Sequence, residues 1–194
     1  MYIYNILNIL MGTSTAANYA AVTPDGRYIL AVGDCAIGEF YDACLFQKVG
    51  RVQVCKNAAF SCCWDHTSTK FAVACQDGFL SVWDFRKYDV PMKTFESEQS
   101  FERGAFRSVK FSPSGLADLL FFSEHESLAH VVDARTLNYK QTLRTDEESS
   151  YNVNIAGICF SPNCESLFIA TEKCTYEYVV DLTLRRRFPI GEYN

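Results

Sequence analysis

Residues 61–84 read SCCWDHTSTKFAVACQDGFLSVWD: short apolar runs separated by polar turns and closed by a Trp-Asp pair. Apolar runs of this length are typical of strands and are too short for helices. The dipeptide Asp77-Gly78 favours a tight hairpin between two of the runs. The stretch therefore predicts antiparallel strands joined by short turns.

The same order of features recurs along the chain. A closing aspartate returns in steps of 42, 49 and 48 residues, at Asp42, Asp84, Asp133 and Asp181. A residue in the first turn of each unit returns in steps of 42, 47 and 49 residues, at Pro24, His66, Pro113 and Pro162. Because two independent landmarks keep one period, the sequence predicts four copies of a single β-sheet unit.

The period, the turns and the closing aromatic-Asp pair together resemble the WD40 repeat. Trp83-Asp84 is the literal signature, and the other units end in Tyr41-Asp42, Val132-Asp133 and Val180-Asp181. The repeat signature comprises Asp42, Asp77, Trp83, Asp84, Asp133 and Asp181. The resemblance implies an all-β fold: a partial, about four-bladed WD40-like β-propeller of four-stranded antiparallel blades, each stabilised by its neighbours.

The chain also departs from the family pattern. The Gly-His pair that usually opens a WD40 repeat is absent before all four units, and the Trp occurs in one unit. The Asp/His/Ser/Trp hydrogen-bond set of a full repeat therefore cannot be complete, and we expect Asp77 and Trp83 to keep part of it. The stretch 119–135 is similar to one that marks a fungal group of divergent WD-repeat proteins with a poorly characterised C-terminal propeller domain.

The period divides the chain into an N-terminal segment and four units. We expect blades at about 16–58, 59–105, 106–152 and 153–194, preceded by segment 1–15. A WD40 disc usually has about seven blades. The chain is then a fragment of a longer propeller, an unusually small one, or one completed by self-association. The apolar residues 2–11 are expected to form an outer strand of a missing blade or the strand that closes the last one.

Charge and composition exclude several classes of partner. There are 18 basic and 23 acidic residues, a net charge of −5, which disfavours nucleic acid and anionic membranes as partners. The stretch 2–11 is too short to span a bilayer and lacks the cationic start of a signal peptide. Nine cysteines without a CxxC pair disfavour a zinc site or a disulfide framework. We expect an intracellular protein, cytoplasmic or nuclear, with most cysteines buried.

Nothing in the sequence predicts catalysis. His125-Glu126 and His130 look like a zinc-protease motif, but the two histidines are five apart on a predicted strand-turn-strand. The vicinal pair Cys62-Cys63 is expected to place one thiol in the core and the other between blades. Arg185–Arg187 is too short a basic run for a nucleic-acid platform. We therefore expect no enzyme activity, catalytic residue, cofactor or metal.

The repeat register predicts an acidic face, because the loops between second and third strands share one side with the loops between blades. The acidic residues there are Asp34, Asp77, Glu96, Glu98, Glu102, Glu124, Glu126, Asp146, Glu147, Glu148 and Glu172. The candidate apolar anchors beside them are Phe101, Phe106 and Tyr151. The opposite, basic face would carry Arg27, Lys70, Arg86, Lys87, Arg135 and Arg185–Arg187.

These expectations lead to a non-catalytic role. The resemblance implies a rigid scaffold that presents propeller loops to partner proteins, including basic peptides steered to the acidic face. An alternative is a substrate-receptor or adaptor subunit of a ubiquitin ligase complex. A chromatin- or RNA-associated role is a third and weaker expectation.

Overall fold

The computed structural model describes residues 15–99, 104–145 and 153–182. In these residues the chain is all-β, as the sequence predicts, and its strands form four antiparallel sheets of consecutive strands. Three sheets have four strands and the last has three, so the expectation of four strands per unit is met in three of the four units within the described ranges.

Each sheet falls inside one sequence repeat. The first sheet contains β1 (Ala17–Val22), β2 (Tyr28–Gly33), β3 (Ile37–Asp42) and β4 (Lys48–Gln53). The second contains β5 (Ala59–Trp64), β6 (Lys70–Cys75), β7 (Phe79–Asp84) and β8 (Lys93–Glu96). The third contains β9 (Phe106–Phe111), β10 (Leu119–Glu124), β11 (Leu128–Asp133) and β12 (Gln141–Arg144). The fourth contains β13 (Ile155–Phe160), β14 (Ser166–Thr171) and β15 (Thr175–Val179).

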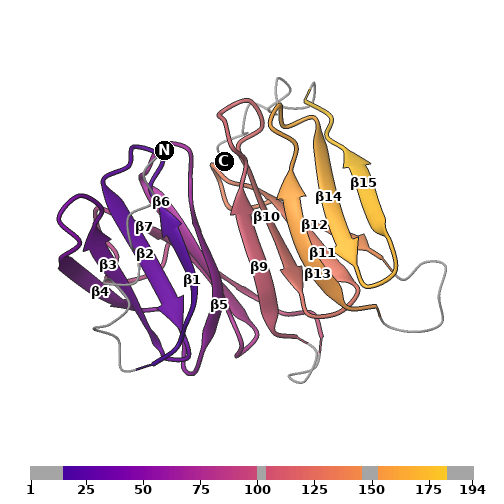
Figure 1. Cartoon of the computed structure of the whole chain (residues 1–194). Helices are drawn as coiled ribbons and strands as arrows, with labels where there is room; N and C mark the ends of the chain where they lie inside the picture. Colours follow the sequence, from indigo (N-terminus) through magenta and orange to yellow (C-terminus); the bar gives the residue numbers. More distant parts are fainter. Residues whose placement is uncertain (1–14, 100–103, 146–152, 183–194) are drawn as a thin grey trace, which may run out of the picture.

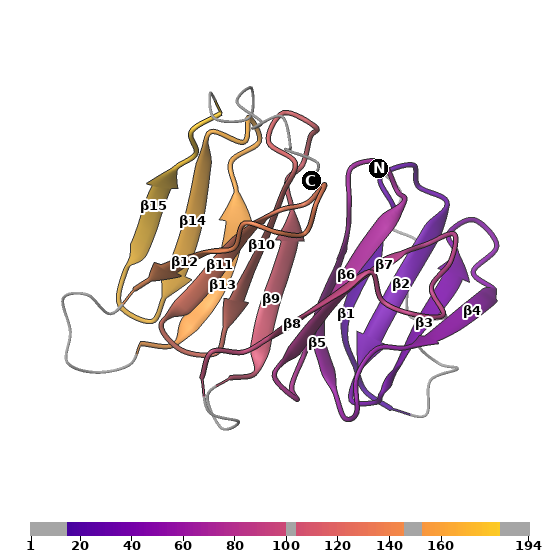
Figure 2. The ribbon, with the colours of Figure 1, turned by 180° about the vertical axis from the view of Figure 1, so that it is seen from behind.

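The sheets stand side by side in chain order, and the first strand of each contacts the first strand of the next (Figure 1). The series of first strands is therefore β1, β5, β9 and β13, with the later strands of each sheet leading away from it. Seen from behind, the outer strands β4, β8 and β12 are in view (Figure 2). The signature aspartates Asp42, Asp84 and Asp133 are the last residues of β3, β7 and β11, so three of the repeat landmarks occupy one structural position.

Apolar side chains between successive sheets form the core. Alternate residues of each strand face opposite neighbours: Phe71 and Val73 of β6 pack toward the first sheet, whereas Ala72 and Ala74 pack toward the third. The vicinal thiols follow the same rule. Cys62 lies in the cluster with the first sheet and Cys63 in the cluster with the third. Both thiols are therefore buried between sheets, whereas the sequence predicted this position for one of them and a core position for the other.

The first turn of every sheet is built in the same way. The side-chain oxygen of Thr23, Asp65, Ser112 or Ser161 accepts a hydrogen bond from the backbone N–H that begins the second strand, at 2.7 to 3.1 Å. The backbone N–H of that same residue donates to the carbonyl of the second strand. Such local bonds are why Ser, Thr and Asp favour turns, and they explain why the period is visible in the sequence.

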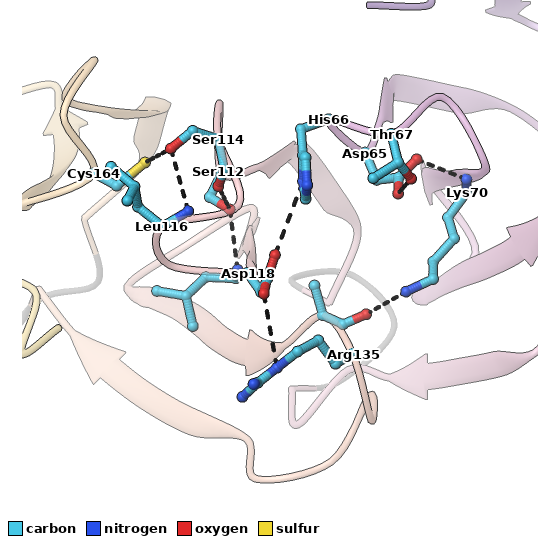
Figure 3. A network of polar contacts seen from close by, with 12 residues as sticks. Asp65, His66, Thr67, Lys70, Ser112, Ser114, Leu116, Asp118, Arg135 and Cys164 are labelled. Carbon is cyan, nitrogen blue, oxygen red and sulfur yellow. Dashed lines mark hydrogen bonds and ion pairs between the residues drawn. The ribbon is translucent and has the colours of Figure 1, made fainter. Parts of the chain in front are cut away.

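The turns of neighbouring sheets also touch. Ser68 Oγ accepts a hydrogen bond from the backbone N–H of Asp25, and Asp118 lies 3.9 Å from both His66 Nδ1 and Arg135 Nε. Ser114 Oγ lies 3.4 Å from Cys164 Sγ. Figure 3 shows Asp118 between His66 and Arg135, with Lys70 donating to a backbone oxygen nearby. The first turns of all four sheets are thus linked in series.

Two ends of the molecule follow from this topology. We call the end with residues 23–27, 65–69, 112–118 and 161–165 the turn end; it is uppermost in Figure 1. We call the other end, with the second-to-third-strand turns 34–36, 76–78, 125–127 and 172–174 and the described parts of the links between sheets, the connection end.

Candidate functional site

The connection end carries the acidic residues that the sequence assigns to one face. Asp34, Asp77, Glu126 and Glu172 lie in second-to-third-strand turns, and Glu96 and Glu98 lie where the second sheet leads into the third. The described cations at this end are Lys56, Arg107, Arg144 and Lys173. Acidic side chains therefore outnumber basic ones there.

Four of these carboxylates have no ion-pair partner among the described residues: those of Asp34, Asp77, Glu96 and Glu172. Asp34 accepts a hydrogen bond from Asn18 at 2.8 Å, and Glu172 accepts one from Asn154 at 3.3 Å. Asp77 accepts the backbone N–H of Lys56 at 2.9 Å. Three of the four carboxylates are thus held by neutral donors, and within the described residues no cation compensates the charge of any of the four.

Glu98 differs, because it forms an ion pair with Lys140 and hydrogen bonds with Thr142. The ammonium of Lys140 lowers the pKa of the Glu98 carboxyl. Glu98 belongs to the predicted face, but its charge is already matched within the chain.

Glu124 is a correction to the predicted acidic face, because it is fully buried. Its Oε1 lies 2.9 Å from His130 Nε2, and its two oxygens accept hydrogen bonds from Ser97 Oγ and the backbone N–H of Glu98. Burial favours the neutral form of this carboxyl, but these hydrogen bonds outweigh it and lower the pKa. Glu124 fixes the link between the second and third sheets and offers nothing to a partner.

Phe106 is a second correction. It is fully buried in the cluster between the second and third sheets, where its ring lies 5.4 Å from that of Phe122. The first position of β9 faces inward, so Phe106 is not available as a surface anchor. The remaining predicted residues lie outside the described ranges: Glu102, Asp146, Glu147, Glu148, Phe101 and Tyr151.

The opposite, basic face is corrected in part, because its three described arginines are ion-paired. Arg86 forms an ion pair with Asp84, and Arg135 forms one with Asp133, in each case two residues along the chain. Arg27 is paired with Asp25 in the same way. The guanidinium of Arg86 lowers the pKa of Asp84 to about 2. Each of these three arginines follows its aspartate by two residues in the sequence. Lys70 donates to the carbonyl of Ala134, and Lys87 forms no ion pair with another described residue. Arg185–Arg187 lies outside the described residues.

Two hollows open at the connection end. One, of about 330 Å³, lies between the second-to-third-strand turn of the second sheet and the link that leaves it, with Lys56, Asp77, Glu96 and Gln99 in its lining. The other, of about 520 Å³, is lined by residues of all four first strands and of the turn at His125. Its lining residues are Asn18, Phe60, Arg107, Ser108, His125, Asn154, Ile155 and Ala156.

The sequence does not predict the second hollow from its loops, because most of the lining residues lie on or beside first strands. In the repeat alignment Asn18, Phe60, Arg107 and Ala156 share the second position of the first strand. That shared position in the repeat is the sequence feature from which the hollow could have been predicted.

The remaining motifs give no catalytic geometry. Asp77 accepts hydrogen bonds from backbone N–H groups, and Trp83 stacks on Phe71 with ring centroids 5.1 Å apart. Within the described residues no hydrogen bond joins Asp77 to Trp83, in contrast to the expectation that the two keep part of the WD40 hydrogen-bond set. His125 lies in a turn and His130 in β11, as the strand-turn-strand reading predicts. Within the described ranges no group of His, Cys, Asp or Glu side chains is arranged to hold a metal ion.

The nine cysteines are all free thiols, and the buried ones are Cys55, Cys62, Cys63, Cys75 and Cys164. Burial raises the pKa of the Cys63 thiol to about 12, which makes it unreactive. In the part of the chain that the structure describes, no helix is long and apolar enough to cross a membrane.

Comparisons with known proteins identify relatives in yeasts. Residues 104–144, which contain all four strands of the third sheet, match the model of an uncharacterised protein domain, DUF2415. The chain is 32% identical over 184 residues to uncharacterized protein C4G3.03 of Schizosaccharomyces pombe, covering 89% of this chain and 52% of that protein. It is 37% identical over 87 residues to uncharacterized protein YLR149C of Saccharomyces cerevisiae, covering 44% of this chain and 12% of that protein. The chain thus spans about half the length of the first relative and a small part of the second.

Proposed function

We propose that this chain is part of a WD40-like β-propeller that acts without catalysis, as a rigid platform whose connection end binds cationic segments of partner proteins. The observation that carries this proposal is a group of carboxylates at the connection end that no cation of the described residues neutralises, whereas the arginines of the turn end are ion-paired. At the turn end the arginines at 27, 86 and 135 neutralise the neighbouring aspartates. At the connection end the carboxylates of Asp34, Asp77, Glu96 and Glu172 have no such partner in the described residues.

The arrangement of the sheets supports the propeller part of the proposal. Four sheets of consecutive antiparallel strands follow one another with their first strands adjacent, which is the order in which propeller blades are laid down. Sheets packed in this way hold their turns at fixed positions. A partner segment could then meet several carboxylates at once without a cost for ordering the surface.

The experiment is a binding titration with a fluorescent arginine-rich peptide. We expect the triple variant Asp34→Asn, Glu96→Gln and Glu172→Gln to bind about tenfold more weakly than the unaltered chain. The matched control is Asp89→Asn, Glu165→Gln and Glu177→Gln, which removes the same charge from residues outside the connection end. It should change the affinity less than about twofold.

Ionic strength gives a second measurement. Binding through exposed carboxylates weakens as salt is raised, because the Debye length falls from about 10 Å at 0.1 M to about 3 Å at 1 M. An affinity that ignores salt, or that falls equally in both triple variants, would contradict the proposal.

A further inference from the structure

Arg107 is one of the four described cations at the connection end, where acidic side chains are more numerous. It lies at the second position of β9, in the 520 Å³ hollow where the four first strands converge. Asp34 and Glu172 border this hollow indirectly, through their hydrogen bonds to the lining residues Asn18 and Asn154. The carboxylates of Asp34 and Glu172 are therefore bonded to amides, and neither forms an ion pair with the guanidinium of Arg107.

The guanidinium lies over an aromatic ring and makes no hydrogen bond within the described residues. Its central carbon lies 4.4 Å from the centroid of the Phe60 ring, which is on β5 of the preceding sheet. No hydrogen bond or ion pair joins the Arg107 side chain to another residue of the described ranges, and the residue is exposed. The ring contact leaves the N–H groups of the guanidinium without a hydrogen-bond partner in the described residues, which suits recognition of a planar anion.

Further donors line the same hollow. Ser108, the next residue of β9, has a hydroxyl that can donate one hydrogen bond, and the imidazole of His125 can donate another from the turn beside it. These groups come from two separate segments of the third sheet. A ligand placed against the Arg107 edge would therefore find neutral donors as well as the cation.

We infer that this hollow is a binding site for a single carboxylate, namely an aspartate or glutamate side chain of a bound protein segment, bound by Arg107 where it lies over the Phe60 ring. This inference rests on the proposed function and deepens it. The preferred partner segment would be basic overall, matching the surrounding carboxylates, and would carry one acidic residue at the position that enters the hollow.

The charge of the surroundings favours a carboxylate over a phosphate. A guanidinium and a carboxylate are both planar and form two parallel hydrogen bonds that cancel one unit charge of each sign. A phosphorylated side chain carries close to two negative charges. With one guanidinium to receive it and the carboxylates of Asp34 and Glu172 nearby, the second charge would be repelled.

The experiment compares short synthetic peptides that differ at one place. Each peptide has two arginines before and two arginines after a central residue, which is glutamine, glutamate or phosphoserine. We expect the unaltered chain to bind the glutamate peptide about tenfold more tightly than the glutamine peptide, and more tightly than the phosphoserine peptide. The variant Arg107→Gln should lose the preference for glutamate while still binding the glutamine peptide.

Two further variants separate the site from general charge effects. Phe60→Leu keeps Arg107 but removes the ring beneath it, so the preference for glutamate should fall several-fold. Arg51→Gln removes an exposed strand arginine of the first sheet and should leave the preference unchanged. The thermal midpoint of each variant shows that the fold is intact.

The outcomes are distinguishable. Equal binding of the glutamate and glutamine peptides, or a preference that survives Arg107→Gln, would overturn the carboxylate site and leave the proposed function standing. A preference for phosphoserine would also overturn it, in favour of a phosphate. Failure of every peptide to bind would contradict both the site and the proposed function.

Discussion

The interface between the first and second sheets and the interface between the second and third are built on the same register but with different chemistry. The first is aromatic: Phe71, at its centre, has ring neighbours that include Phe40, Trp64 and Trp83 at 5.1 to 5.4 Å. The second is also apolar, but it contains the buried pair Glu124 and His130. One repeat can therefore be held to its neighbour mainly by packing and another partly by a polar network.

Equivalent positions show where the difference arises. Ser81 of β7 contacts Thr94 of β8 at 2.8 Å, and His130 of β11 contacts Thr142 of β12 at 3.1 Å, so the contact between third and fourth strands is kept. The larger imidazole also reaches Glu124. The equivalent of Glu124 in the second sheet is Cys75, whose thiol bonds the carbonyl of Val54 at 3.6 Å. The link between the second and third sheets is thus fixed by a carboxylate, and the preceding link by a weak thiol contact.

The largest expected effect is on the aromatic interface. Phe71→Ala removes a fully buried ring that the neighbouring aromatic side chains cannot replace, and it should lower the free energy of unfolding by about 5 kcal/mol. Urea denaturation followed by tryptophan fluorescence measures this loss, because Trp64 and Trp83 lie beside Phe71. Phe71→Leu, which keeps most of the volume, should cost less than half as much. An equal loss in both variants would contradict this expectation, because the cost would then not follow the side-chain volume removed.

The polar network should give the next largest effect. Glu124→Ala leaves His130, the Ser97 hydroxyl and a backbone N–H without their buried partner, and it should cost about 3 kcal/mol. The equivalent substitution in the second sheet, Cys75→Ala, removes one thiol and should cost about 1 kcal/mol. The same urea titration compares the two. If Cys75→Ala proves as damaging as Glu124→Ala, the two links do not differ in the way proposed.

Acid should weaken the third sheet more than the second. The pKa of Glu124 is lowered in the folded protein from its ordinary value of 4.5, so its carboxylate contributes stability that is complete above that value. This contribution is lost as the pH falls through the lowered pKa, because the protonated carboxyl no longer accepts the same hydrogen bonds.

We therefore expect the stability difference between the unaltered chain and Glu124→Gln to be largest near pH 7 and to shrink steadily below pH 4.5. Denaturation at several pH values measures it. The variant Cys75→Ala is the control, and its difference should change little over the same range. A Glu124→Gln difference that grows in acid would have the wrong sign and would contradict the assignment.

The sequence predicted the parts of this comparison that depend on local chemistry. Each first-turn landmark directly follows a residue whose side-chain oxygen bonds within a few residues of it, and the closing aspartates also act locally. A period in the sequence is therefore enough to place these turns. The pairing of Glu124 with His130 could not be read, because it depends on which face of β10 and β11 is covered by residues 97–99. The stacking of Arg107 on Phe60 joins two sheets and likewise depends on how they pack.

The smallest expected effects come from the paired aspartates that close β7 and β11. Asp84 and Asp133 make the same bonds to the arginine two residues on, but the Asp133 side chain is 15% exposed and that of Asp84 is 23% exposed. Asp84→Asn should cost no more than about 0.5 kcal/mol, since Asn keeps the bond to the backbone and an exposed ion pair contributes little. Asp133→Asn should cost up to about 1 kcal/mol, because Arg135 also lies 3.9 Å from Asp118 and the altered pair belongs to a network joining two sheets.

A double-mutant cycle between positions 118 and 133 tests whether this network stabilises the third sheet. A coupling energy between positions 118 and 133, with none between positions 84 and 118, would show that the third sheet uses charge where the second relies on packing. If neither pair is coupled, the difference between the two interfaces is confined to Glu124 and His130.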